Sequence, residues 1–252
     1  MPGNLAYQAY QLIWSGLDWI FPPECGGCGK KGVRWCPVCA SESRTISDRC
    51  CEICGDIFVD TEICQRCLEE RPVFTQARSW AVYEGPVRNL VHRLKYKGDI
   101  CLGEALAKPL IFELKRIGWN IDMVIPVPLS LARMAERGYN QAALIALPIA
   151  IGLQVPYQVK ALRKVKDTRS QVGLSYNDRK TNLMDAFKVD VEILKGKRIL
   201  VVDDVTTSGA TLNECARALY EAGACDVFGY TFARAANNKL APNTELLADT
   251  TY

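Results

Sequence analysis

The stretch that decides the fold is ILVVDDVTTSGATL, from Ile199 to Leu212. It opens with four consecutive apolar residues, a pattern typical of a strand that is covered on both faces in a parallel sheet. Two carboxylates, Asp203 and Asp204, follow this run, and a loop rich in hydroxyl groups then leads into a helical pattern. Because ligands of open α/β sheets bind at the carboxyl ends of the strands, the stretch predicts a ligand site.

The loop after the carboxylates has the composition of a phosphate-binding loop. Backbone N–H groups at a helix N-terminus attract anions, and Gly209 lets the backbone approach them closely. The helix expected next carries Leu212, Ala216 and Leu219 on one face and ends near Gly223. A plain helix N-cap with a solvated turn is the structural alternative. Capping uses one hydroxyl, however, and leaves the other hydroxyls and both carboxylates unexplained.

Cysteine spacing gives a second strong pattern. Eight of the 12 cysteines fall in four Cys-x-x-Cys pairs, namely Cys25/Cys28, Cys36/Cys39, Cys51/Cys54 and Cys64/Cys67. Two such pairs provide the four thiolates of a closed tetrahedral Zn²⁺ site, so the sequence predicts one or two structural zinc ions. The simplest arrangement joins pairs that are neighbours in the sequence. An interleaved arrangement, disulfides and an iron–sulfur or redox site are the alternatives.

Length and composition fit one small module joined to one larger domain, with 252 residues of which 49% are hydrophobic. We expect an N-terminal amphipathic helix (1–22), a Cys-rich zinc-binding module (23–72), an α/β domain (73–235) and a flexible tail (236–252). Polar residues interrupt the apolar N-terminal segment, so we expect it to dock on the body rather than to span a membrane. The absence of a secretory signal favours a cytoplasmic location, with membrane-peripheral association as the alternative.

Positive charge is concentrated in the larger domain. The first 72 residues contain seven Lys and Arg against ten Asp and Glu, whereas the whole chain has a net charge of +3. Basic residues gather in RNLVHRLKYKGD (88–99) and KALRKVKDTR (160–169). Such clusters are either solvated faces or sites for a polyanion, which is a pyrophosphate or a nucleic-acid backbone. The candidates for nucleic-acid contact are Lys95, Lys97, Arg163, Lys164, Lys166, Arg169 and Arg179.

The larger domain alternates between strand and helix patterns, which predicts a parallel sheet flanked by helices. Strands are expected near 80–83, 123–127, 156–159, 187–189, 199–202 and 227–232. Helices are expected over 89–97, 103–118, 141–152 and 211–224. Pro148 is expected to kink or break the third of these helices. Arg133 and Arg137 are four residues apart, so they share one face of a further helical segment.

The segment VVDDVTTSGATL resembles the phosphoribosyl pyrophosphate (PRPP) motif of type I phosphoribosyltransferases. The resemblance implies that the acidic pair holds the ribose hydroxyls, with help from Mg²⁺, and that the loop holds the 5′-phosphate. The PRPP-binding residues that it implies are Asp203, Asp204, Thr206, Thr207, Ser208, Gly209, Ala210 and Thr211. A Walker-type nucleotide loop fits poorly, because no Lys-Ser or Lys-Thr follows the glycine.

The order of these motifs resembles the ComF family of competence-associated proteins, in which a multi-Cys zinc module precedes a phosphoribosyltransferase-like domain. The resemblance runs from about Phe21 to Arg234, and it includes VIPVPLSLARMAERGYNQA and DTRSQVGLSYNDRKTNLMDAF. It implies a catalytic set of Asp203, Asp204, Arg133 and Arg137. It also places Gly138, Asn140 and Gln141 near the pyrophosphate side. A loop over the site would contain Thr168, Gln171, Leu174, Arg179 and Asn182.

Three functions follow from these patterns. The first is a competence protein that binds PRPP or a 5′-phosphorylated ligand with Mg²⁺ and handles single-stranded DNA. The second is an active phosphoribosyltransferase whose acceptor the sequence does not name. The third is a metal-organised module that docks a DNA-translocating helicase, with the PRPP site as a sensor. The fold class alone does not establish catalysis.

Overall fold

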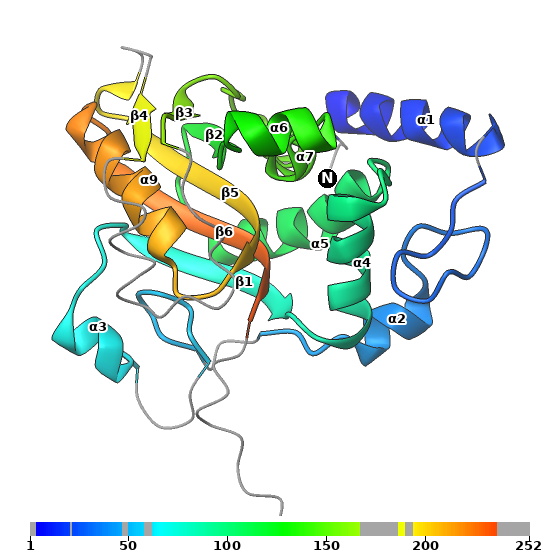
Figure 1. The fold of residues 1–252 in the computed structure, drawn as a ribbon, viewed down its shortest axis with the longest axis horizontal. Helices are drawn as coiled ribbons and strands as arrows, with labels where there is room; N and C mark the ends of the chain where they lie inside the picture. Colours follow the sequence, from blue (N-terminus) through cyan, green and yellow to red (C-terminus); the bar gives the residue numbers. More distant parts are fainter. Residues whose placement is uncertain are drawn as a thin grey trace, which may run out of the picture.

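The structure is a computed structural model that describes residues 4–20, 22–46, 50–57, 62–166, 186–189 and 194–235. Its helices are α1 (Leu5–Ile20), α2 (Pro37–Glu42), α3 (Gln65–Glu69), α4 (Gly85–Tyr96), α5 (Leu102–Ile117), α6 (Leu131–Arg137), α7 (Gln141–Leu153) and α9 (Ala210–Glu221). Its strands are β1 (Gln76–Val82), β2 (Met123–Pro126), β3 (Leu162–Lys164), β4 (Phe187–Val189), β5 (Arg198–Thr206) and β6 (Asp226–Arg234). Figure 1 shows their arrangement.

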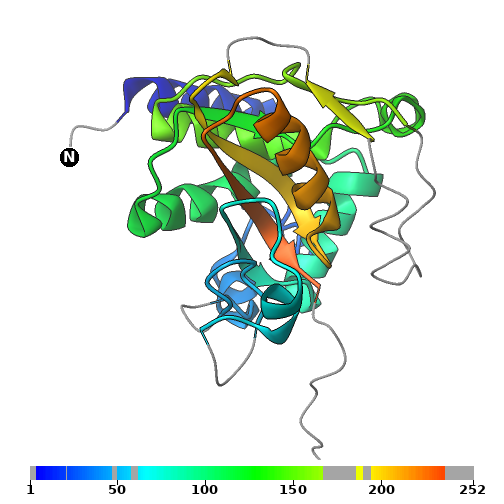
Figure 2. The ribbon, with the colours of Figure 1, turned by 90° about the vertical axis from the view of Figure 1, so that its left-hand side faces the viewer.

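A four-stranded parallel sheet organises the larger domain, and its strands follow the order β1-β6-β5-β2. β5 lies inside the sheet and pairs in parallel with β6 on one side and with β2 on the other. Helices α4, α5 and α7 cover one face, while α9 and the antiparallel β3–β4 ribbon cover the other (Figures 1 and 2). The predicted parallel α/β fold with flanking helices is therefore confirmed.

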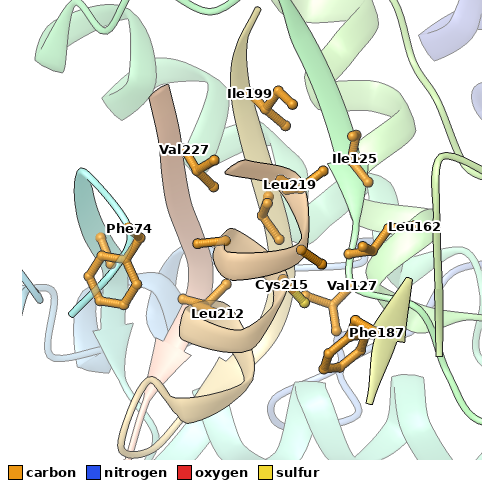
Figure 3. Close-up of a cluster of buried hydrophobic side chains, with 14 of the residues drawn as sticks. Phe74, Ile125, Val127, Leu162, Phe187, Ile199, Leu212, Cys215, Leu219 and Val227 are labelled. Atoms are coloured by element: carbon orange, nitrogen blue, oxygen red, sulfur yellow. The ribbon is translucent and has the colours of Figure 1, made fainter. Parts of the chain in front are cut away.

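The apolar run at the start of β5 supplies both cores of the domain. Ile199 and Val201 belong to the cluster beneath α9, which also contains Cys215 (Figure 3). Leu200 and Val202 belong to the cluster against α4, α5 and α7. Successive side chains of a strand point to opposite faces, so a continuous apolar run is what a strand covered on both sides requires.

Several element boundaries differ from the sequence-based expectations. The strand expected at 156–159 is wrong: Tyr157 makes one isolated bridge to Val124, and the next strand is β3. The chain does not break at Pro148, because α7 runs through this residue. Burial of Ile145 and Ile149 on either side of the proline compensates for the lost hydrogen bond. Finally, β5 extends to Thr206, so the acidic pair lies within the strand.

The two halves of the Cys-rich module dock at different places on the larger domain. In the first half, Gly26 lies so close to α4 that a Cβ there would come within 2.8 Å of Leu90 Cγ. In the second half, Ile53 accepts a backbone hydrogen bond of 2.7 Å from Ala77 of β1. Helix α1 contacts α7, and its Asp18 forms an ion pair with the first half of the module. None of the described helices combines the length and apolarity that a membrane span needs.

Candidate functional site

The acidic pair, Asp203 and Asp204, lines a cleft of about 580 Å³ at the carboxyl edge of the sheet. As neighbours in a strand, Asp203 and Asp204 point to opposite faces. Asp204 belongs to the α4 face, where its Oδ2 atom lies 2.6 Å from Nζ of Lys95. The Asp204 side chain is 3% exposed and the Lys95 side chain 19%, so they form a buried ion pair. Within the pair of carboxylates, the Asp204 backbone N–H donates to Asp203 Oδ1 at 2.8 Å.

These charged groups shift one another's pKa. Burial raises the pKa of Asp203 well above its usual value, and the Asp204 charge raises it further while Lys95 opposes the increase. Burial lowers the pKa of Lys95, but the charge of Asp204 and its hydrogen bond outweigh that effect and raise the pKa overall. Strongly perturbed titratable groups in a cleft are typical of functional sites.

The predicted phosphate-binding loop joins the end of β5 to the N-terminus of α9. Gly209 precedes α9 with a φ of +81°, a conformation that strains residues with side chains. The Ser208 hydroxyl accepts a hydrogen bond from the Ala210 N–H at 3.4 Å. The residues of this loop that line the cleft are Thr206, Thr207, Gly209, Ala210 and Thr211. Ser208 instead lines a smaller adjoining pocket that faces the second half of the Cys-rich module.

Helix α6 contributes positive charge to the same cleft. Both predicted arginines, Arg133 and Arg137, line it. The Arg137 guanidinium donates to Gln141 Oε1 at 2.9 Å and lies 5.0 Å from the centre of the Tyr96 ring. The structure thus brings the acidic pair, the loop and both arginines together, although they come from distant parts of the sequence.

Two residues expected on the pyrophosphate side have structural tasks. Gly138 adopts a φ of +76° and ends α6. Asn140 caps α7 by accepting from the Ala142 and Ala143 N–H groups, and its amide donates to the Val127 carbonyl at 3.0 Å. Neither residue lines the cleft.

The basic residues predicted to contact nucleic acid occupy different positions. Lys95 is partly buried in the cleft beside Asp204, a pairing that the sequence did not indicate. Lys164 lines the same cleft, while Lys97, Arg163 and Lys166 are exposed. The remaining predicted residues lie outside the described part of the chain: Arg169, Arg179, Thr168, Gln171, Leu174 and Asn182.

The eight paired cysteines form two clusters, each made from pairs that are neighbours in the sequence. One contains Cys25, Cys28, Cys36 and Cys39, and the other contains Cys51, Cys54, Cys64 and Cys67. In each cluster the sulfur atoms lie within 4.8 Å of one another, and the cysteines are free thiols. The sulfurs of Cys28 and Cys36 are 3.8 Å apart and those of Cys54 and Cys64 are 3.6 Å apart. The edge of a tetrahedral zinc–thiolate site is about 3.8 Å, so both clusters fit Zn²⁺.

Each cluster also contains one thiol with a lowered pKa. Burial raises the pKa of Cys25, but N–H groups of Cys36, Cys28 and Gly27 outweigh it and lower the value to about 6. A hydrogen bond from Cys67 lowers the pKa of Cys54 to about 4 against the effect of burial, and the Arg234 charge contributes to this decrease. Burial raises the pKa of Cys39 in the first cluster and of Cys64 in the second, so Cys25 and Cys54 are the more acidic thiols.

Family models match both parts of the chain. A double zinc ribbon domain matches residues 16–68, and a phosphoribosyl transferase domain matches residues 102–246. Fold, cysteine clusters and cleft thus define a protein in which a double zinc ribbon precedes a phosphoribosyltransferase domain. We refer to the Cys25–Cys39 part as the first ribbon and to the Cys51–Cys67 part as the second ribbon.

Curated relatives identify the family. The DNA utilization protein YhgH of Shigella flexneri is 32% identical over 222 residues, which cover 86% of this chain and 96% of that protein. Competence protein F of Haemophilus influenzae is 30% identical and covers 84% of this chain and 90% of its own. Competence protein ComFC of Bacillus subtilis is 27% identical over 88% of this chain and 90% of its own. The chain belongs to the ComF family.

Proposed function

We propose that the cleft binds PRPP, or another ligand with a 5′-phosphorylated ribose, together with Mg²⁺. The observation that carries this proposal is the convergence of the acidic pair, the loop before α9 and the two α6 arginines on one cleft. Carboxylates accept hydrogen bonds from ribose hydroxyls, while a helix N-terminus and arginines attract phosphate groups. A sugar that carries phosphate at one end and pyrophosphate at the other matches this distribution of charge.

The acidic pair also suits Mg²⁺. This ion prefers hard oxygen ligands and is held by one or two carboxylates together with the phosphates of the substrate. Lys95 already balances Asp204, which leaves Asp203 as the carboxylate with capacity for the ion or for the ribose hydroxyls. When bound, the ion would neutralise part of the charge on the pyrophosphate group.

For the biological role, we propose that the protein acts in competence and handles single-stranded DNA in the cytoplasm. Relatives over most of its length are named DNA utilization and competence proteins. A 5′-phosphorylated strand end carries the same ribose phosphate as PRPP, and the cleft-lining Lys164 lies next to further basic residues at 163 and 166. Cysteine clusters of this kind require reduced thiols, which accords with the cytoplasm.

Active phosphoribosyl transfer is the second candidate, and Arg133 and Arg137 in the cleft favour it. In such a transfer the bond from C1 of the ribose to pyrophosphate breaks, and positive groups stabilise the departing pyrophosphate. The residues that line the cleft do not name an acceptor. Docking of a DNA-translocating helicase stays a prediction.

The test is calorimetric titration of the full chain with PRPP and Mg²⁺. We expect binding by the wild type, loss of binding in the Asp203→Asn/Asp204→Asn variant, and retained binding in Asp122→Asn. Asp122 is a suitable control because it makes an ion pair of 2.9 Å with Arg198 and does not line the cleft. A wild type that binds neither PRPP nor ribose 5-phosphate would overturn the proposal. Magnesium-dependent release of pyrophosphate across a panel of acceptors then separates transfer from binding.

A further inference from the structure

Arg234, the last residue of β6, is one of the largest fully buried side chains of the described residues. Its exposed fraction is 1%. An arginine stays charged in proteins, and a buried charge must be paired and hydrogen-bonded to be tolerated. The partners of Arg234 therefore indicate what the fold gains by keeping a cation at this position.

The guanidinium of Arg234 joins the second ribbon to the phosphate-binding loop. It donates to the carbonyl of Cys54, one of the four thiols of the second ribbon. On the same ribbon, Asp56 Oδ1 lies 3.6 Å from one of its terminal nitrogens. That nitrogen also donates to the carbonyl of Thr207 at 3.4 Å, and Thr207 belongs to the loop that lines the cleft. One buried side chain thus contacts a metal-binding turn and the loop.

We propose that Arg234 is a positioning residue that couples the zinc-bound conformation of the second ribbon to the geometry of the phosphate-binding loop. The inference rests on the proposed function of that loop. Zinc would fix the turn around Cys54 and with it the carbonyl that holds the guanidinium. The guanidinium in turn fixes the Thr207 carbonyl, and so the direction of the backbone before Gly209. Preorganised donors bind a phosphate better than donors that must first be ordered.

Other contacts at the same junction support this coupling. Phe74, in the segment that follows the second ribbon, packs against Gly209. A Cβ atom added to Gly209 would lie 3.8 Å from the Phe74 ring. The neighbouring Val73 N–H donates to Asn213 Oδ1 in the first turns of α9 at 2.6 Å. Figure 2 shows the second ribbon, in cyan, beside the ends of β5 and β6. The segment that follows the second ribbon is therefore packed against both the loop and the helix after it.

Arg78 of β1 provides a matched control. It also donates to carbonyls of the second ribbon, at 3.3 Å to Cys51 and 2.9 Å to Glu52. Its third acceptor is the carbonyl of Ala77 in its own strand, and the bonds found for it among the described residues include none to the phosphate-binding loop. Loss of Arg78 therefore tests attachment of the ribbon alone, whereas loss of Arg234 tests attachment of the ribbon to the loop.

The experiment compares Arg234→Gln with Arg78→Gln in the full chain. Calorimetry measures the affinity for PRPP with Mg²⁺ and for ribose 5-phosphate, hydrogen–deuterium exchange follows residues 206–211, and metal analysis gives the zinc content. We expect Arg234→Gln to weaken both ligands by about tenfold and to speed exchange in the loop, with zinc retained. Arg78→Gln should change neither readout by more than about twofold. A folded Arg234→Gln protein with wild-type affinity and exchange would overturn the proposal.

A second pair of variants tests the zinc link directly. Cys64 and Cys28 are the least buried thiols of their clusters, so Cys64→Ser and Cys28→Ser each remove one thiol from the second or the first metal site. We expect faster exchange of residues 206–211 in Cys64→Ser alone; equal exchange in both variants would contradict the coupling.

If Arg234→Gln does not fold, Asp56→Asn takes its place, because it removes the counter-charge of Arg234 from the ribbon side. We expect the same direction of change, and wild-type values would overturn the proposal. A wild type that binds neither ligand contradicts the proposed function only, since exchange in the loop still decides whether Arg234 positions it.

Discussion

The ammonium of Lys95 lies 2.6 Å from Oδ2 of Asp204, so helix α4 and strand β5 are joined by a buried ion pair inside the cleft. Two adjacent carboxylates repel each other strongly where water is excluded. Lys95 offsets this repulsion and fixes one of the two carboxylates. Burial and the charge of Asp204 raise the pKa of the neighbouring Asp203, although Lys95 opposes this increase.

Removal of Lys95 should destabilise the protein. Lys95→Met leaves the buried Asp204 without its cation, and breaking a buried pair in this way costs about 3 kcal/mol. Lys97→Met is the control, because Lys97 is exposed on the turn after α4 and its loss should stay within about 0.5 kcal/mol. Urea denaturation measures both values. Equal unfolding free energies for the two variants would contradict the pairing of Lys95 with Asp204.

Asp203 should give the stability a pH dependence of defined sign. Burial and the Asp204 charge raise its pKa in the folded chain, so above the ordinary Asp value of about 4 the folded state binds more protons than the unfolded state. Because the folded state holds the extra proton, the unfolding free energy falls as pH rises through this window. Asp203→Asn removes the titration. We therefore expect wild type to lose stability relative to Asp203→Asn as the pH is raised from about 4 towards the raised pKa.

Urea denaturation at a series of pH values measures this difference between wild type and variant. A difference that does not change with pH would show that Asp203 titrates alike in the folded and unfolded chains. Asp122→Asn is the counter-example with the opposite sign, because a hydrogen bond from Arg198 lowers the pKa of Asp122. Its contribution is present above the ordinary Asp value and is lost as pH falls.

The main features of the fold could be predicted from the sequence because they depend on local patterns. Four apolar residues before Asp203 predicted a strand that is buried on both faces, and β5 has that environment. The Cys-x-x-Cys spacing predicted two clusters, since each pair forms its own tight turn. The helix does not break at Pro148 because the local cost of the proline is offset by the packing of α7 on both sides of it.

Contacts between distant segments could not be predicted from local sequence patterns. Lys95 sits in a basic cluster that the sequence left as either a solvated face or a polyanion site, and its partner Asp204 belongs to a strand far along the chain. Arg234 ends an apolar strand, where an arginine usually reaches solvent. Its burial follows from the second ribbon packing over the strand end, which no local pattern indicates. The three residues of β3 are likewise too few to give a periodic signal.

The zinc content should match the two cysteine clusters. Protein purified without chelator should contain two Zn²⁺ per chain, because each cluster offers four thiols at zinc-binding spacing. Cys39→Ser should reduce this number to about one, since Cys39 belongs to the first cluster. Cys215→Ser is the control, because Cys215 is a buried residue of α9 and lies outside both clusters. Mass spectrometry of metals gives the count, and a well-folded chain that is oxidised and free of metal would contradict the assignment.

Binding of single-stranded DNA should depend on salt and on the basic residues beside the cleft. Lys164 lines the cleft, and Lys166 is exposed just beyond β3. Charge reversal of these two lysines puts two carboxylates at the point where the backbone of a DNA strand would enter. We expect Lys164→Glu/Lys166→Glu to weaken binding by about an order of magnitude at low salt and to flatten the salt dependence. The control is Lys30→Glu/Lys31→Glu, which changes the net charge by the same amount on the first ribbon and should weaken binding less.

Fluorescence anisotropy with a labelled oligonucleotide at several salt concentrations measures the affinity of both double variants. Equal weakening by the two variants would mean that overall charge, rather than the cleft, attracts DNA. Affinity that changes with neither salt nor variant would remove DNA handling from the proposed role.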